Sequence, residues 1–298
     1  MHEPAESFAD ASTKPRSAIQ LHTLRCIEKP LPATIRRVAS AGYDGVEFAD
    51  RFLTSDLAAV RTVLTRTNTV PIGAHVDLER LERNPESVVD RCRRVGCRRI
   101  VIPHIQSRHF RTKERVNALA YRMNTLSDRL EADGIELSYH TAREAFLPLL
   151  ELFRPGIPTA IPIPDGGWNY IADTFGQVFR SDATDKSGRT GFYRLVDRTS
   201  DRITFEVDVG WVAATGTDPV PIFDHLGDRL SMIHIADVTV SRRFPRAFQS
   251  TTPGDGLIDL ERIVSAAYET DAEWIIFEDD DPADPEAAIR QGINIITQ

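Results

Sequence analysis

The stretch ITFEVDVGWVAATGTDPVPIFDHLGDRLSMIHIAD, residues 203–237, decides the fold. Its pattern predicts a strand over Ile203–Val207, a loop, a short crossover helix and a second strand over Leu230–Ile235. Asp208 follows the first strand, and His234 lies near the end of the second. Parallel strands joined by a crossover, each with a candidate metal ligand at its C-terminal end, are typical of the way α/β enzymes build a site.

The same alternation of strand and helix extends outward to both ends of the chain. Eight strands are predicted, over Ala18–Leu24, Tyr43–Phe48, Val70–Val76, Arg99–Ile105, Ile135–Tyr139, Ile203–Val207, Leu230–Ile235 and Trp274–Phe277. Helical periodicity or capping residues predict helices over 31–41, 55–67, 84–95, 112–132, 143–153 and 257–270, a crossover helix from 218 and a closing helix after Asp284.

Eight strand and helix units in one series predict a single-domain (β/α)8 TIM barrel. An open doubly wound sheet is the main alternative. No glycine-rich phosphate loop follows any predicted strand, which weakens the nucleotide-binding form of that alternative.

The length of 298 residues and a hydrophobic content of 41% permit one large barrel with a substantial core. We expect residues 1–16 to form a flexible, polar N-terminal tail and residues 17–298 to form the barrel. The segment from about 155 to 191 is rich in Pro, Gly, Asp and Ser, and it interrupts the alternation of strands and helices. It is interpreted as an elaborated loop, because the alternation resumes directly after it.

Composition limits the classes of function. The net charge of -8 argues against a general nucleic-acid binder, since an acidic surface repels phosphate. The three cysteines have no CxxC spacing, so neither a disulfide framework nor a structural zinc cluster is expected. No run reaches the roughly 18 apolar residues that a membrane span needs, and the polar start is unlike a signal peptide. We therefore expect a cytoplasmic protein.

Imidazole and acidic side chains recur where the predicted strands end. In a barrel these ends share the C-terminal face, where such enzymes carry their active sites. Histidine and carboxylate without thiolate suit a divalent cation held by nitrogen and oxygen ligands. The residues expected on this face are His22, Glu47, His75, His104, His140, Asp208, His234 and Glu278.

Each of these side chains has a structural alternative when taken alone. A single histidine at a strand end is more often a hydrogen-bonded core residue, and a lone glutamate there is commonly a cap or a surface group. Their recurrence at the same point of successive strands is what favours a shared site.

Short segments with motif character follow one another along almost the whole chain. They are IQLHTLR (19–25), GYDGVEFA (42–49), GAHVDLERL (73–81), YHTAREAF (139–146), FEVDVGWVAATGTDP (205–219), IHIAD (233–237), PGDGLIDL (253–260) and WIIFEDDDP (274–282). In this order they resemble the motifs of the xylose isomerase-like barrels, also described as sugar phosphate isomerases/epimerases. The set is fairly specific for that superfamily and poorly specific for a substrate.

The resemblance implies one divalent metal ion, Mn²⁺, Zn²⁺, Co²⁺ or Mg²⁺, held by Asp208, His234 and Glu278. His140 is the fourth candidate ligand, with substrate binding as its alternative. His140 stands where many relatives have a glutamate. The pair of metal-bound glutamates that epimerases use for proton transfer on two faces is therefore incomplete. Alanine also replaces the second histidine of a YHNH-type motif, at Ala142, and the lysine of the HxKD motif, at Ala236.

Chemistry at such a site begins with removal of a proton next to a carbonyl, which a divalent cation assists by stabilising the enediolate. We expect Glu278 to be both ligand and base, with His75, His104 or Glu47 contacting substrate or moving protons. His22, Trp211 and Arg246 are the candidates for substrate binding. Trp211 has core packing as its alternative, and the arginines near Arg246 a solvated loop.

Asp237 has two interpretations: it fixes a ligand histidine through that histidine's other ring nitrogen, or it caps a loop.

Three enzyme functions compete. The first is a metal-dependent isomerase or epimerase of a sugar, sugar phosphate or polyol. The second is a lyase or dehydratase on a keto-sugar or keto-inositol, which the missing carboxylate at position 140 mildly favours. The third is an endonuclease of abasic DNA, which the acidic charge disfavours. A non-catalytic binding protein is a further alternative. The expected partner is a small carbohydrate or polyol, without nucleic acid or membrane, and homo-oligomerisation stays open.

Overall fold

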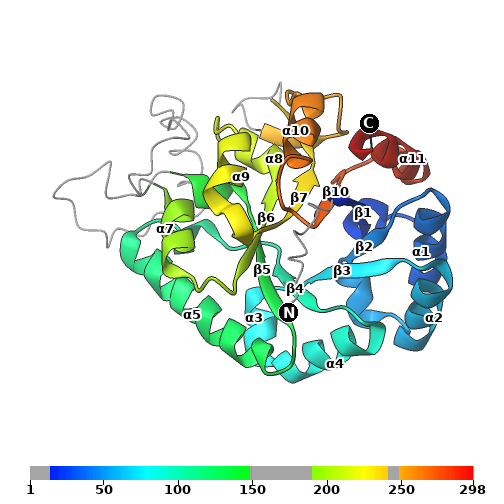
Figure 1. The fold of residues 1–298 in the computed structure, drawn as a ribbon, viewed down its shortest axis with the longest axis horizontal. Coiled ribbons are helices and arrows are strands. Elements are labelled where there is room, and N and C mark those ends of the chain that lie inside the picture. Colours follow the sequence, from blue (N-terminus) through cyan, green and yellow to red (C-terminus); the bar gives the residue numbers. More distant parts are fainter. Residues whose placement is uncertain (1–13, 148, 150–189, 241–247, 298) are drawn as a thin grey trace, which may run out of the picture.

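The computed structural model contains a closed barrel of parallel strands, described over residues 14–147, 149, 190–240 and 248–297 (Figure 1). Neighbouring strands follow the order β1-β10-β7-β6-β5-β4-β3-β2, so the last strand of the series pairs with the first. This order confirms the (β/α)8 barrel over the open sheet. The barrel strands are β1 Arg16–Gln20, β2 Gly45–Phe48, β3 Val70–His75, β4 Arg99–Ile102, β5 Glu136–His140, β6 Thr204–Asp208, β7 Leu230–Ile235 and β10 Trp274–Phe277.

Helices surround the strands on the outside of the barrel (Figure 1). Several begin at capping side chains: Asp56 accepts hydrogen bonds from the backbone at the start of α2, Thr112 does so for α5 and Asp284 for α11. An ion pair between Arg37 of α1 and Glu286 of α11 joins the first helix to the last. The helices are α1 Leu31–Ser40, α2 Leu57–Thr67, α3 Leu78–Arg83, α4 Pro85–Val95, α5 Lys113–Glu131, α7 Gly191–Arg198, α8 Val209–Ala213, α9 Val220–Leu226, α10 Leu260–Ala267 and α11 Pro285–Ile296.

The structure differs from the sequence prediction at several boundaries. Strand β1 ends at Gln20, and Leu21–Leu24 form a 3-10 turn instead of continuing the strand. A 3-10 turn over Arg143–Phe146 begins where a longer helix was expected. Residues 1–13 of the predicted tail and 155–189 of the predicted elaborated loop lie outside the described residues.

A small antiparallel hairpin was not predicted. It pairs β8 (Asp237–Val240) with β9 (Phe248–Thr251), within a segment interpreted from the sequence as a loop.

Inside the barrel, polarity changes from layer to layer. One apolar cluster fills the middle, formed by Ala18, Ile72, Val101, Met232, Trp274 and Ile276. Toward the C-terminal strand ends the inward side chains become polar, because Glu206 and Asp208, two residues apart, face the same side of β6. The polar residues there are Gln20, Glu47, His75, His140, Glu206, Asp208, His234 and Glu278.

An ion-pair group closes the opposite end of the barrel. Arg99 of β4 donates two hydrogen bonds to Glu136 of β5, at 3.1 and 3.0 Å, and a third to Glu273 at 2.6 Å. Nearby, the Arg16 guanidinium lies 4.6 Å from the ring centre of Trp274. This end is therefore held by structural contacts, and the polar layer at the other end is left for chemistry.

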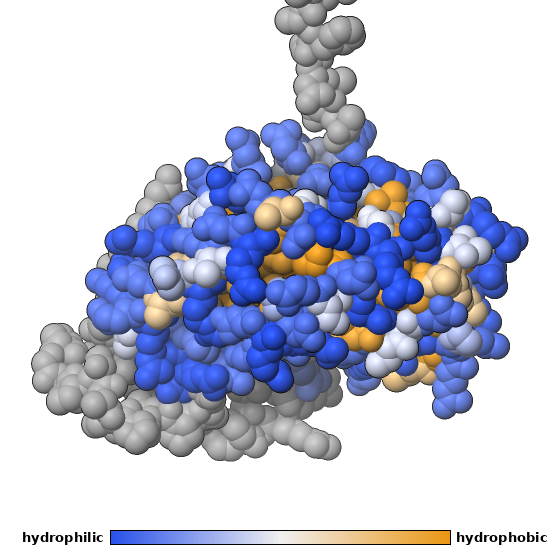
Figure 2. Space-filling view, turned by 90° about the horizontal axis from the view of Figure 1, so that it is seen from below, coloured by the Kyte–Doolittle hydropathy of each residue, from blue (hydrophilic) through white to orange (hydrophobic). Residues whose placement is uncertain are grey.

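Hydrophilic residues cover most of the surface seen in Figure 2, with apolar residues exposed between them. No helix in the described ranges is long and apolar enough to cross a membrane.

Candidate metal centre

Four buried side chains converge at the C-terminal ends of neighbouring strands, and we call them the strand-end cluster. His140 ends β5, Asp208 ends β6, His234 lies in β7, and Glu278 directly follows β10. One ligand atom from each lies within 4.8 Å of the others. His234 Nδ1 is 2.7 Å from Glu278 Oε2, and His140 Nε2 is 3.6 Å from Asp208 Oδ2. The donor set of two imidazoles and two carboxylates fits a divalent cation.

Several ligand atoms of the strand-end cluster have no hydrogen-bond partner among the described residues. They are both ring nitrogens of His140 and Oδ2 of Asp208, all of them buried. Burying such polar atoms without partners costs free energy. A cation between them would supply the missing interaction, so the cluster passes a physical test for metal binding.

Asp208 is fixed by the turn from β6 into α8. Its Oδ1 accepts a hydrogen bond of 2.8 Å from the backbone N–H of Trp211, which caps α8. Its own N–H donates to Thr141 Oγ1 at 3.0 Å. One carboxylate oxygen thus orients the side chain, and the other is left directed at the cluster.

A pocket of about 260 Å³ opens beside the strand-end cluster. His140 and Glu278 line it, so a small molecule in the pocket would reach two of the four cluster residues. The other lining residues are His22, Ala49, Asp50, Leu53, His75, Val76, Asp77, Pro103, Trp211 and Asp280. The structure thus places the predicted residues His22, His75 and Trp211 on the same pocket wall as the cluster.

A second group of four, which we call the buried ring, lies against the first and shares His234 with it. In the buried ring, carboxylates and imidazoles alternate: Glu47, His75, Glu206 and His234. Oε2 of Glu47 is 3.2 Å from His75 Nε2 and 3.0 Å from His234 Nε2. Glu206 makes matching contacts, with Oε2 at 3.2 Å from His75 Nε2 and Oε1 at 3.0 Å from His234 Nε2.

Burial and neighbouring charges shift the pKa values of the groups around the pocket in different directions. Burial alone would lower the pKa of His75, but the carboxylates of Glu47 and Glu206 outweigh it and raise this pKa to about 10. Burial alone would raise the pKa of Glu278, but His234 and His140 outweigh it and lower this pKa to about 2. Burial, followed by the charges of Glu278 and Asp208, raises the pKa of Asp280 to about 7.

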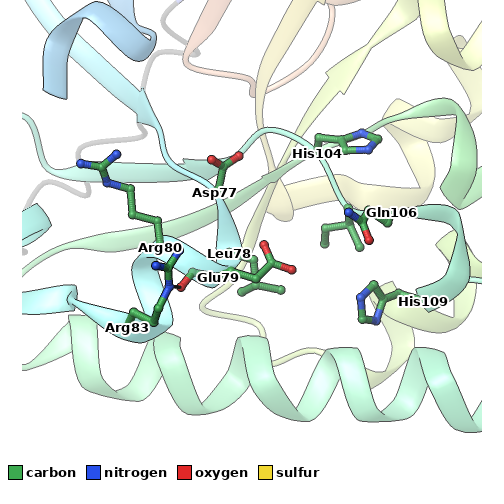
Figure 3. Close-up of a pocket in the computed structure, with 9 residues that line it drawn as sticks. Asp77, Leu78, Glu79, Arg80, Arg83, His104, Gln106 and His109 are labelled. Carbon is green, nitrogen blue, oxygen red and sulfur yellow. Dashed lines mark hydrogen bonds between the residues drawn. The ribbon is translucent and has the colours of Figure 1, made fainter.

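The structure does not bring His104 to the strand-end cluster. It is exposed and lines a separate pocket of about 270 Å³ with Asp77, Arg80, Gln106 and His109 (Figure 3). Strand β4 ends at Ile102, two residues before His104, so the inward alternation of the strand no longer directs this side chain.

Another predicted residue, Glu47, also lies away from direct contact with the pocket. Glu47 is fully buried and is absent from the pocket wall, so it reaches the pocket only through its histidine neighbours. Arg246 lies outside the described residues.

Asp237 organises a loop instead of a ligand histidine. Its carboxylate accepts five backbone N–H bonds of 2.8 to 3.2 Å, from Val238, Gly254, Gly256, Leu257 and Ile258. Gly256 is needed because a Cβ there would meet Asp237 Oδ1 at 2.1 Å. These contacts agree with the loop-capping interpretation of Asp237, and none of them reaches a histidine.

Replacing Asp237 with alanine is expected to lower the free energy of unfolding by about 2 kcal/mol, because several backbone donors lose a charged acceptor that water replaces only in part. Urea unfolding measures the loss, and amide hydrogen exchange at Gly256–Ile258 should become faster. Asp255, exposed on the same loop, is the matched control. Equal stability of Asp237→Ala and Asp255→Ala would contradict this role.

Sequence reasoning missed Glu206 and Gln20. Glu206 lies two residues before Asp208 on the same strand, and this spacing alone indicates that both face the barrel interior. Gln20 donates a hydrogen bond of 2.7 Å from Nε2 to Glu47 Oε2. The two-residue period of inward-facing side chains along a strand could have identified both residues from the sequence.

Comparisons with known proteins agree with this architecture. A family model described as "Xylose isomerase-like TIM barrel" matches residues 190–298. An inosose dehydratase of Lacticaseibacillus casei is 33% identical over 105 residues, covering 30% of this chain and 35% of that protein. The chain is thus aligned with about a third of the length of this curated relative.

Solved structures match over nearly the full length. A sugar phosphate isomerase/epimerase from Parabacteroides distasonis ATCC 8503 has a TM-score of 0.68 at 15% identity, covering 99% of each chain. An IOLI protein with a bound zinc atom has a TM-score of 0.67 at 15% identity, covering 95% of this chain and 98% of that one. Identities this low establish the fold alone. The solved structures thus share the barrel fold over nearly the full length, and residues 190–298 also match the xylose isomerase-like TIM barrel family model.

Proposed function

We propose that this protein is a divalent-metal-dependent enzyme that removes a proton next to the carbonyl of a keto-sugar or keto-polyol and expels water from the neighbouring carbon. The observation that carries the proposal is the strand-end cluster beside a pocket of about 260 Å³, whose wall includes two groups that can move protons, Glu278 and His75.

His140, Asp208, His234 and Glu278 would hold the cation. When bound, it supplies Lewis-acid stabilisation of the negative charge that develops on the substrate carbonyl oxygen. The buried position of these four side chains excludes water and strengthens every electrostatic interaction at the reacting atoms.

Glu278 and His75 stand in opposite protonation states at neutral pH, as a base and an acid require. With its pKa near 2, the Glu278 carboxylate is ionised at neutral pH and can accept the proton from the substrate carbon. With its pKa near 10, His75 carries a proton and can donate it to the departing hydroxyl. The C–H and C–O bonds break, a C=C bond forms, and water leaves without a change in oxidation state.

Two observations favour dehydration over isomerisation. His140 occupies the place where the family resemblance implies a second glutamate, so the strand-end cluster contains one glutamate, Glu278, instead of a pair. The similarity to an inosose dehydratase points the same way. Isomerisation or epimerisation is the second candidate, because Glu278 and His75 on one pocket could also take a proton from one carbon and return one to its neighbour.

Incubation of inososes and ketoses with the protein in deuterated water tests the proposal by NMR. We expect the substrate to exchange a proton for deuterium and to lose water. Exchange together with an isomeric product would support isomerisation or epimerisation instead. A chelator should stop either reaction. The variant Glu278→Gln should lose exchange, while Glu136→Gln, at the opposite end of the barrel, should retain it. Binding of metal without exchange of any keto-polyol would overturn the proposal.

A further inference from the structure

The buried ring lies beneath the candidate metal ligands, and of its four residues only His75 lines the pocket. Glu47 and Glu206 are fully buried, and each lies 3.0 Å from His234 Nε2. Side chains in such a position act on a substrate only through the residues they touch.

His234 links the two groups through its two ring nitrogens. Its Nδ1 lies 2.7 Å from Glu278 Oε2, on the side of the strand-end cluster, and its Nε2 faces Glu47 and Glu206. A neutral imidazole carries one N–H, and a nitrogen that binds a metal must offer its lone pair. Binding through Nδ1 therefore requires the hydrogen on Nε2, where Glu47 Oε2 lies at 3.0 Å to accept it.

Glu47 is itself held in place from both sides. Gln20 Nε2 donates to Glu47 Oε2 at 2.7 Å, and Gln20 Oε1 accepts from the His22 backbone N–H at 3.1 Å, which fixes the orientation of the amide. Gly73 on β3 leaves room for the carboxylate, because a Cβ there would lie 2.6 Å from Glu47 Oε1. Residues of the two neighbouring strands, β1 and β3, thus fix the Glu47 carboxylate against His234.

We propose that Glu47 and Glu206 are positioning residues for the metal site: Glu47 accepts the hydrogen on His234 Nε2, and the Glu206 carboxylate places its charge 3.0 Å from the same nitrogen, so that Nδ1 is turned toward the strand-end cluster as a ligand. This inference rests on the proposed function in so far as that function places a cation in the cluster. Carboxylates that accept the remote N–H of a ligand histidine orient its ring and raise its basicity.

The buried ring also has a donor set that could hold a second cation, but its hydrogen bonds favour the positioning role. The Gln20 amide group points a donor at the ring, 2.7 Å from Glu47 Oε2 and 3.3 Å from His75 Nε2. An ion inside the ring would face that N–H. It would also compete for His234 Nε2, which must keep its hydrogen while Nδ1 binds a metal.

The test measures zinc affinity by competition with a chelator of known affinity, together with the number of ions per chain. Glu47→Gln and Glu206→Gln keep side-chain size and remove the charge, and each should weaken zinc binding about 10- to 100-fold. The cobalt(II)-loaded variants should also show a shifted visible absorption spectrum, because the orientation of the His234 ring changes. The control Glu136→Gln removes a barrel carboxylate that contacts Arg99 instead, and its zinc affinity should equal that of the wild type.

Gly73→Ala provides a second variant if Glu47→Gln fails to fold. It displaces the Glu47 carboxylate without removing its charge, and it should weaken zinc binding in the same direction. Two results would overturn the inference. One is a zinc affinity that stays within about threefold of the wild-type value in the folded variants. The other is a wild-type chain that binds two ions and loses one of them in Glu206→Gln. Weakened zinc binding without exchange of any keto-polyol would leave the inference standing and remove only the proposed function.

Discussion

Replacement of Asp208 with asparagine is expected to remove the bound divalent ion and to lower the rate of proton exchange at least about 1000-fold. A metal that stabilises developing negative charge contributes several kcal/mol to the transition state, and about 4 kcal/mol corresponds to this factor. Asparagine keeps an oxygen for the Trp211 N–H that caps α8 and removes the carboxylate charge from the strand-end cluster. The fold should therefore survive while metal binding fails.

Elemental analysis of the purified variant and exchange in deuterated water measure the two parts of this prediction. Asp218→Asn serves as the control, because this aspartate pairs with Arg262 on the exterior and takes no part in the strand-end cluster. Asp208→Asn with a full complement of metal would exclude Asp208 as a ligand.

Replacement of Arg99 with methionine is expected to lower the free energy of unfolding by about 3 kcal/mol. Arg99 is 6% exposed and donates to both Glu136 and Glu273, so its loss leaves two carboxylates without their cation. Breaking a buried pair costs about 3 to 5 kcal/mol, and the lower end applies because both glutamates retain access to water. Metal content should be unchanged, since Arg99 lies at the opposite end of the barrel.

Urea unfolding of Arg262→Met provides the comparison for this prediction. Arg262 also binds one carboxylate through two hydrogen bonds, to Asp218, but both side chains are substantially exposed. Its loss should cost under about 1 kcal/mol. Equal losses in the two variants would show that burial does not set the strength of the Arg99 pair.

Much of the barrel could be predicted because its signals are local. The strands Leu230–Ile235 and Trp274–Phe277 have the bounds expected from their apolar runs. Helix α4 begins at Pro85 and ends at Val95, next to a glycine in the left-handed conformation. The hairpin of β8 and β9 could not be predicted in this way, because it depends on the pairing of Asp237 with Thr251, which are 14 positions apart in the sequence.

The residues expected at the candidate metal site likewise divide into those that local strand periodicity places correctly and one that it does not. His140, Asp208 and His234 lie within their strands, where the two-residue alternation turns them inward, and Glu278 follows β10 directly. His104 lies two residues beyond the end of β4, where no alternation applies, and its side chain lies on another pocket.

The stretch over residues 203–237 determined by itself that two parallel strands carry Asp208 and His234 at or near their C-terminal ends, because strand periodicity and a crossover helix are encoded in adjacent residues. Tertiary structure decided which side chains those two residues meet. Closure of the barrel brings Glu47 of β2 to 3.0 Å from His234 of β7, across 187 positions of sequence. Contacts across a barrel depend on its radius and on the register between strands, and no local sequence pattern specifies either of them.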